Sequence, residues 1–177
     1  LMLALSLPMA NAALDPWTGE PTGTEISAWL TIDPNSQVTI RVAQSEMGEG
    51  VFTAMPMLVA EELDCDWSQV KAEYASANRS VRENGVYKRM GTGGSGAVRR
   101  SREYLQQAGA SARERLKAAA AARWEVPVAE LRTEGGEVFH DASGRRTAYG
   151  VLAAEAAAIT LAAEPAIRRA GEFKLLR

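Results

Sequence analysis

Residues 97–124 have the sequence AVRRSREYLQQAGASARERLKAAAAARW, and this stretch decides the fold. It contains no proline and is dominated by strong helix formers, above all alanine and arginine. Apolar residues recur at helical spacing, so the stretch predicts one long amphipathic helix that ends before Glu125-Val126-Pro127. We expect its apolar face to pack closely against a sheet. That face is narrow and consists of Val98, Leu105, Ala108, Ala112, Leu116, Ala119 and Ala122.

The segments that precede the long helix alternate between strand and helix patterns. Two β-rich runs, residues 28–32 and 37–42, flank the turn sequence at 33–36 and predict a β-hairpin. Residues 51–63 have apolar positions at helical spacing and predict a shorter helix. Pro56 is tolerable in that helix only if it lies in the first turn.

The remaining elements complete the fold class. We predict a strand at 70–74, a loop at 75–96, a hairpin of 131–134 and 137–140 around two glycines, a helix at about 148–163, and a strand within 171–177. The order β-β-α-β-α-β-β-α implies an α+β fold. In this fold a mixed β-sheet carries the long Ala-rich helix and two shorter helices.

The composition is that of a globular domain. The sequence has 177 residues, of which 46% are hydrophobic and 24% are charged, and this length suits one domain or one domain with a tail. The net charge of −2 and the pI near 5.6 argue against a general nucleic-acid binder. The chain has one cysteine, Cys65, and one histidine, His140. These counts exclude an internal disulfide and a metal centre built from several Cys or His side chains.

The first 25 residues have the pattern of an export signal followed by a linker. Residues 1–13 form an apolar run that ends in Ala10-Asn11-Ala12, a small-x-small sequence typical of signal cleavage, and the run is too short to span a bilayer. We assign them to the remnant of an export signal, which implies a periplasmic protein without a membrane span. A short apolar element docked on the core is the alternative. Residues 14–25 are rich in Pro, Gly, Thr and acidic residues and predict a linker.

Two glycine-rich loops each precede a predicted helix. One loop leads into the helix at 51–63, and the other leads through Gly96 into the long helix. A helix N-terminus offers free N–H groups and the positive end of the helix dipole, and glycine lets an anion approach the backbone. Each loop alone is more simply a turn with a helix cap. Together they predict one anion site, in which the two loops converge on a phosphorylated cofactor, made of Gly48, Glu49, Gly50, Gly93, Gly94 and Ser95.

Residues 42–50, with the sequence VAQSEMGEG, resemble a signature of the molybdenum hydroxylases. These are the molybdopterin-binding large subunits of the xanthine dehydrogenase and aldehyde oxidase family. The resemblance is greatest to the isoquinoline 1-oxidoreductase beta subunit type, in which this block lies near the N-terminus behind an export signal. It covers about residues 25–177 and continues in MLVAEEL at 57–63, TGGS at 92–95, Val98-Arg99, QQAGA at 106–110 and FKLL at 173–176.

This resemblance implies a molybdopterin-binding domain over residues 26–168 and the start of a following segment at 169–177. It implies molybdopterin as the cofactor, with the cytosine dinucleotide form as one option. The intact enzyme would hydroxylate a small molecule, an aldehyde or an N-heterocycle, with oxygen from water. Electrons would pass to a small [2Fe–2S] subunit and on to an acceptor such as a c-type cytochrome. The catalytic base and the molybdenum contacts would follow Arg177, so we expect no turnover by residues 13–177 alone.

Four positions differ from the pattern of the resembling family. Glu49 stands where the family has glutamine, and a carboxylate neither donates a hydrogen bond nor attracts a phosphate. Gly96 and Ala97 replace hydroxyl residues, and Arg100 stands where an acidic residue is common. Glu49, Gly96 and Ala97 favour a second hypothesis, a truncated or degenerate α+β module that does not bind cofactor. General anion binding by the two loops is a third.

Other residues have structural interpretations. We interpret Glu46 as a structural or capping carboxylate and Cys65, between two aspartates that raise its pKa, as an inert thiol. His140 ends a hairpin strand and is expected to be exposed. The tryptophans Trp29, Trp67 and Trp124 are expected as core or edge anchors. A basic cluster would face solvent, cofactor phosphates or a partner subunit, and it contains Arg82, Lys88, Arg89, Arg99, Arg100 and Arg102 against Glu83 and Glu103.

Overall fold

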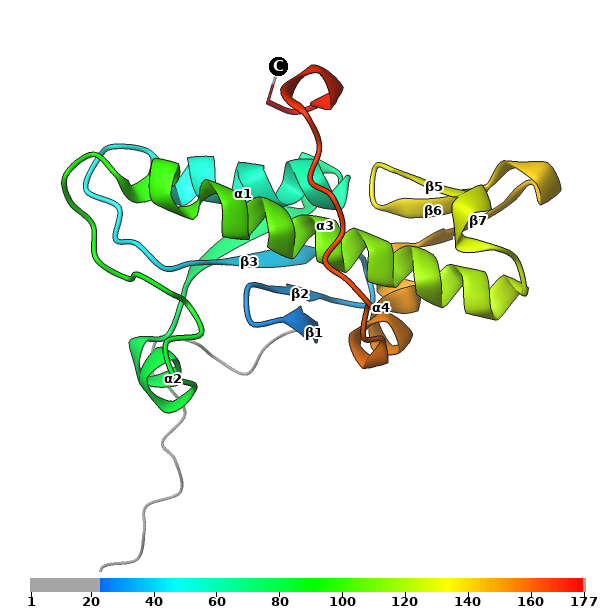
Figure 1. Ribbon diagram of the computed structural model, residues 1–177, viewed down its shortest axis with the longest axis horizontal. Helices are drawn as coiled ribbons and strands as arrows, with labels where there is room; N and C mark the ends of the chain where they lie inside the picture. The colour runs from blue at the N-terminus through cyan, green and yellow to red at the C-terminus, as the bar shows by residue number, and fades with distance from the viewer. Residues whose placement is uncertain (1–22, 177) are drawn as a thin grey trace, which may run out of the picture.

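The computed structural model describes residues 23–176, which form two β-sheets and four α-helices (Figure 1). The predicted α+β class is confirmed. The export-signal remnant predicted at 1–13 and most of the linker predicted at 14–25 lie outside the described residues. The first strand begins at Thr24, so the last two residues of that predicted linker belong to the sheet. No helix in the described part of the chain is long and apolar enough to cross a membrane.

The larger sheet is mixed, as predicted. Its strands are arranged in the order β1-β2-β3-β4, with β1–β2 and β2–β3 antiparallel and β3–β4 parallel. The predicted hairpin corresponds to β2 and β3. The carboxylate of Asp33 closes its turn, because it accepts hydrogen bonds from the backbone N–H of Asn35 and Gln37 at 2.8 and 2.9 Å. The strands span Thr24–Ser27 (β1), Leu30–Ile32 (β2), Val38–Val42 (β3) and Val70–Tyr74 (β4).

Three helices build the core with this sheet (Figure 1). Helix α1 (Val51–Leu63) connects β3 to β4 and packs on both strands, and α4 (Tyr149–Ala158) packs on β1 and β2. Helix α3 (Ala97–Trp124) has the predicted bounds, and it lies across α1 and α4. The prediction that its apolar face packs mainly on the sheet was wrong, since its main partner is α1.

The close crossing of α3 over α1 explains this difference. A Cβ atom placed on Gly109 of α3 would lie 2.4 Å from the carbonyl oxygen of Val59 and 2.8 Å from the Cβ of Glu62, both on α1. The backbones therefore meet where α3 has no side chain. Of the predicted face, Leu105, Ala112, Leu116 and Ala119 are buried, Val98 and Ala108 are half-buried, and Ala122 is exposed.

The smaller sheet is a three-stranded antiparallel meander at the far end of α3. Its first two strands form the predicted hairpin around Gly135-Gly136, whose φ angles of 57° and 87° are those of a tight two-residue turn. The third strand, β7, was not predicted, and it pairs with β6 in a sheet that is separate from the larger one. The strands span Leu131–Glu134 (β5), Glu137–His140 (β6) and Arg145–Ala148 (β7).

Four further expectations are corrected by the structure. The predicted loop at 75–96 contains the short helix α2 (Ala77–Arg82), capped by the Ser76 hydroxyl, which accepts from the Arg79 N–H at 3.1 Å. Helix α4 ends at Ala158, before the predicted end at 163. Pro56 is the sixth residue of α1, beyond the first turn where it was expected, and its buried ring packs in the core. The strand expected within 171–177 is a 3-10 turn at Ala170–Glu172 instead.

Residues 165–176, which we call the C-terminal strap, run across α3 to the end of α1 (Figure 1). Two side chains of α1 that the solvent does not reach, Glu61 and Glu62, hold the strap through its backbone. Glu61 accepts from the N–H groups of Lys174, Leu175 and Leu176 at 2.8, 2.6 and 3.0 Å. Glu62 accepts from the Arg168 N–H at 2.9 Å, and burial raises the pKa of this carboxyl group.

Candidate functional site

The first glycine loop is closed by its own carboxylate. One oxygen of Glu46 accepts from the N–H groups of Gly48 and Gly50 at 2.7 and 2.9 Å, and the other accepts from the Phe52 N–H at 2.9 Å. These hydrogen bonds, led by that of Phe52, lower the pKa of the Glu46 carboxyl group. Glu46 is thus the capping carboxylate that the sequence predicted. The N–H groups at the start of α1 therefore already donate to an anionic side chain of the protein itself.

The second glycine loop has no such internal anion. Within the described residues, no side chain caps the start of α3 at Gly96, and its first turn carries no acidic residue. Gly94 and Ser95 have φ angles of 63° and 48°, and a Cβ placed on Gly94 would meet nothing within 4 Å. The loop therefore presents a helix N-terminus whose first N–H groups are open to a ligand.

The two loops converge, as the sequence predicted. The Thr92 hydroxyl donates to the carbonyl of Ser45 at 3.0 Å, which ties the loops together. A hollow of about 430 Å3, which we call the shared cavity, lies between the N-termini of α1 and α3. Glu49 and Ser95 both line it, and the Glu49 carboxylate is exposed and accepts from the Met47 N–H at 2.8 Å. Its other lining residues are Met47, Val51, Thr92, Gly93, Gly94, Gly96, Ala97 and Val98.

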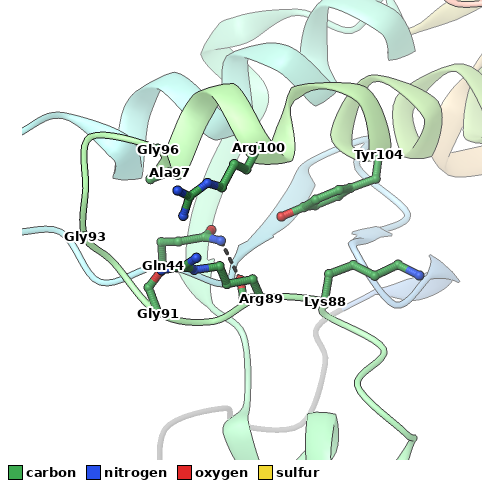
Figure 2. A pocket seen from close by; sticks show the side chains of 9 residues that line it. All are labelled: Gln44, Lys88, Arg89, Gly91, Gly93, Gly96, Ala97, Arg100 and Tyr104. Carbon is green, nitrogen blue, oxygen red and sulfur yellow. Dashed lines mark hydrogen bonds between the residues drawn. The ribbon is translucent and has the colours of Figure 1, made fainter.

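A second hollow lies on the other side of residues 93–97, and we call it the basic cavity (Figure 2). Its volume is about 250 Å3, and Arg100 and Tyr104 reach into it from α3. The Gln44 amide donates to the carbonyl of Arg89 at 2.6 Å and ties the loop at 88–91 to the segment that follows β3. The cavity is lined by Gln44, Lys88, Arg89, Gly91, Gly93, Gly96, Ala97, Arg100 and Tyr104.

The chemistry of these groups suits an anionic, phosphate-bearing cofactor at the α3 end of the site. Open N–H groups, loop glycines and basic side chains meet there, and all three favour an anion. The α1 end does not suit a phosphate, because Glu46 occupies its donors and Glu49 adds a second carboxylate. No group of three or more His, Cys, Asp or Glu side chains among residues 23–176 is arranged to hold a metal ion.

Three other sequence interpretations can be compared with the structure. His140 is only 5% exposed, so the expectation of an exposed histidine was wrong: its ring nitrogens contact the Ser143 hydroxyl at 2.7 Å and the Glu130 carboxylate at 2.9 Å. Burial, more than the two neighbouring aspartates, raises the pKa of the Cys65 thiol to about 12, which confirms an unreactive cysteine. Trp29 is a core residue that stacks edge-on against Tyr87.

A family model for the molybdopterin cofactor-binding domain matches residues 4–175. The chain belongs to this family. The site residues named from the sequence therefore lie in a molybdopterin cofactor-binding domain, and the structure brings both predicted loops together in it. Sequence reasoning had no signal for Tyr104, because it acquires its place only when α3 and the loop at 88–91 meet, and it gave Gln44 no role of its own within the motif at 42–50.

Two curated proteins resemble this molybdopterin cofactor-binding domain. The isoquinoline 1-oxidoreductase subunit beta of Brevundimonas diminuta is 36% identical over 152 residues, which is 84% of this chain and 19% of that protein. The membrane-bound aldehyde dehydrogenase (pyrroloquinoline-quinone) of Gluconacetobacter polyoxogenes is 32% identical over 89 residues, which is 50% of this chain and 11% of that protein. The chain thus spans less than a fifth of the length of the curated relatives it matches.

A solved structure shares the fold. The crystal structure of quinoline 2-oxidoreductase from Pseudomonas putida 86 aligns with a TM-score of 0.52 and 22% identity. The alignment covers 70% of this chain and 15% of that chain. At this identity the likeness concerns the arrangement of the helices and sheets of the molybdopterin cofactor-binding domain.

Proposed function

We propose that the chain supplies part of the molybdopterin-binding site in the large subunit of a molybdenum hydroxylase-type oxidoreductase. One observation carries this proposal: the two glycine loops, about 45 residues apart in the chain, meet at the shared cavity in a domain of the molybdopterin cofactor-binding family. Gly94, Ser95 and the open N–H groups of α3 would contact the cofactor from one loop. Gly48, Glu49, Gly50 and Gly93 complete the proposed cofactor-binding residues.

The reaction, the substrate and the partners belong to the same proposal. The bound cofactor would supply hydroxylation of an aldehyde or an N-heterocycle with oxygen from water, and the chain's own residues would bind and orient it. The likeness to a protein named as a beta subunit supports a multi-subunit enzyme. A small [2Fe–2S] subunit would take the electrons, and a c-type cytochrome is a candidate acceptor after it. The N-terminal pattern favours a periplasmic enzyme, and the cytosine dinucleotide is a candidate form of the cofactor.

A degenerate module that has lost the cofactor is the alternative, and the acidic first loop favours it. Glu49 lines the shared cavity, and Glu46 already satisfies the N–H groups at the start of α1. A phosphate beside both carboxylates would be repelled. Measurement of molybdenum in the purified intact subunit distinguishes the two functions, because only the first requires the metal.

Replacing Gly94 with alanine is expected to lower the molybdenum content of the intact subunit severalfold. The new Cβ would project beside the loop backbone, where the cofactor must approach closely. Gly144 is a matched control, since its φ of 67° is close to the 63° of Gly94, its Cβ would also meet nothing, and it lies in the turn between β6 and β7. Metal analysis should show normal loading for Gly144→Ala. Equal loading of both variants would contradict a cofactor at this loop.

Replacing Glu49 with glutamine is expected to raise molybdenum retention by the intact subunit. The change removes a negative charge from the shared cavity and restores an amide donor. The control is Glu134→Gln, which removes the same charge from an exposed residue of β5. Retention is measured as metal remaining after dialysis. An unchanged content in Glu49→Gln would leave Glu49 without a role in cofactor binding.

A further inference from the structure

The basic cavity contains positive charge that the described residues leave uncompensated. Lys88, Arg89 and Arg100 line it, and none of them has a carboxylate within ion-pair distance in residues 23–176. Glu103 lines a neighbouring hollow together with Arg100. The N-terminus of α3, the positive end of its helix dipole, also borders the basic cavity. Cations at a helix N-terminus repel the dipole, so this arrangement is favourable only when an anion joins it.

The two cavities on either side of residues 93–97 differ in charge. The shared cavity has a carboxylate, Glu49, and apolar side chains such as Val51 and Val98. The basic cavity has three basic side chains and no acidic one. In Figure 2 the Arg100 guanidinium lies near the loop residues, and the Tyr104 hydroxyl points into the same space, while the Lys88 side chain extends away from them. The basic cavity therefore favours an anionic part of a ligand, and the shared cavity favours an uncharged part.

We propose that the basic cavity, and not the space between the two loops, holds the phosphate or pyrophosphate group of the cofactor. The guanidinium groups of Arg89 and Arg100 are its charged ligands, with the Tyr104 hydroxyl beside them. The uncharged part of the cofactor then lies toward the shared cavity, where the Glu49 carboxylate is near the anionic cofactor without contacting its phosphate. This assignment rests on the proposed function and adds to it the residues that recognise the anionic end.

Gly96 positions Arg100 for this task. A Cβ at Gly96 would lie 2.9 Å from both Cζ and Nε of Arg100, so the absence of a side chain lets the guanidinium fold back over the start of α3. The contact is with the end of a flexible side chain. A methyl group at residue 96 would therefore displace Arg100 without disturbing the core. Gly96→Ala and Arg100→Gln test one site by two routes, one by moving the charge and one by removing it.

The experiment titrates the 177-residue chain with inorganic pyrophosphate and, separately, with inorganic phosphate, and follows the binding by calorimetry. Charged hydrogen bonds of this kind support losses of about tenfold or more in affinity when a guanidinium is removed. We expect that loss for Arg100→Gln and Arg89→Gln, and a similar one for Gly96→Ala. Tighter binding of pyrophosphate than of phosphate would indicate a dinucleotide-type ligand, and the reverse order a single phosphate. Circular dichroism confirms that each variant is folded.

Arg99→Gln is the matched control. Arg99 lies at the same helix end and is exposed, but it does not line the basic cavity, so its loss changes the local charge equally. Its affinity should stay within about twofold of the wild type, as for a screened surface charge. Equal losses in Arg99→Gln and Arg100→Gln, or no binding of either anion by the wild-type chain, would overturn the assignment.

The assignment and the proposed function fail in different ways. Normal anion binding by Arg100→Gln, together with loss of molybdenum in Gly94→Ala, would leave the cofactor site in place and move the phosphate elsewhere. Arg100-dependent anion binding in a chain whose intact subunit never holds molybdenum would overturn the proposed function, and with it the claim that the phosphate belongs to this cofactor.

Discussion

Replacing Gly109 with valine is expected to lower the free energy of unfolding by about 3 kcal/mol. The new side chain would meet the backbone of α1, where even a Cβ lies 2.4 Å from the Val59 carbonyl oxygen. The helices must then separate, and the buried side chains on either side of the crossing lose contact. The intrinsic helix preference of valine over glycine offsets only a small part of this loss. Urea denaturation of the 177-residue chain measures the change.

Gly171→Val is the control for this substitution. Gly171 lies in the C-terminal strap, and a Cβ there would meet nothing within 4 Å. Its stability should change by less than about 0.5 kcal/mol, as for most surface substitutions. Gly109→Ala is expected to fall between the two. If Gly109→Val were as stable as the wild type, α3 would not cross α1 at the distance described.

Removing the Glu61 carboxylate, by Glu61→Ala, is expected to cost about 3–5 kcal/mol of stability. The carboxylate is inaccessible to solvent and accepts from three consecutive backbone N–H groups at 174–176. Its loss leaves these three donors without their acceptor, while the Arg168 guanidinium keeps Asp64 and the backbone carbonyl of residue 61 as acceptors. The strap should detach from α1, so hydrogen exchange at residues 174–176 should accelerate more than exchange in β3.

Two comparison variants separate this effect from a general loss of charge. Glu61→Gln keeps one carbonyl acceptor and should lose less stability than Glu61→Ala. Glu155→Gln removes an exposed carboxylate that pairs with Arg123, and exposed pairs contribute less than about 1 kcal/mol. Unchanged exchange at 174–176 in Glu61→Ala would mean that the strap is held by other contacts, such as those of Lys174 with Asp64.

The longer elements of the fold could be predicted because their patterns are repeated many times. Helix α3 has 28 residues, so its spacing defines both ends, and the hairpins are marked by Asp33 and by Gly135-Gly136. Helix α2 has six residues and β7 has four, and neither is long enough to show a period. The burial of His140 depends on Glu130 and Ser143, which come from different turns, and no local pattern reports such contacts.

The candidate site could be predicted in part. Glycines before helices are visible in the sequence, and the convergence of the two loops followed from the need of one cofactor for both. The separation of charge between the two cavities could not be predicted. It depends on which way Glu49 and Arg100 point from neighbouring backbones, and on the capping of α1 by Glu46. Sequence spacing places these residues close together without assigning them to opposite sides of residues 93–97.

Burial of Glu61 couples the end of α1 to the strap. The carboxylate of Glu61 accepts from backbone N–H groups more than 100 residues later in the chain, while its neighbour Glu62 also contacts Gln106 and Arg113 of α3. A carboxylate removed from water without its partners is strongly destabilising, so Glu61 is buried only when residues 174–176 have docked. Docking of the strap and loss of water at the end of α1 are therefore a single step.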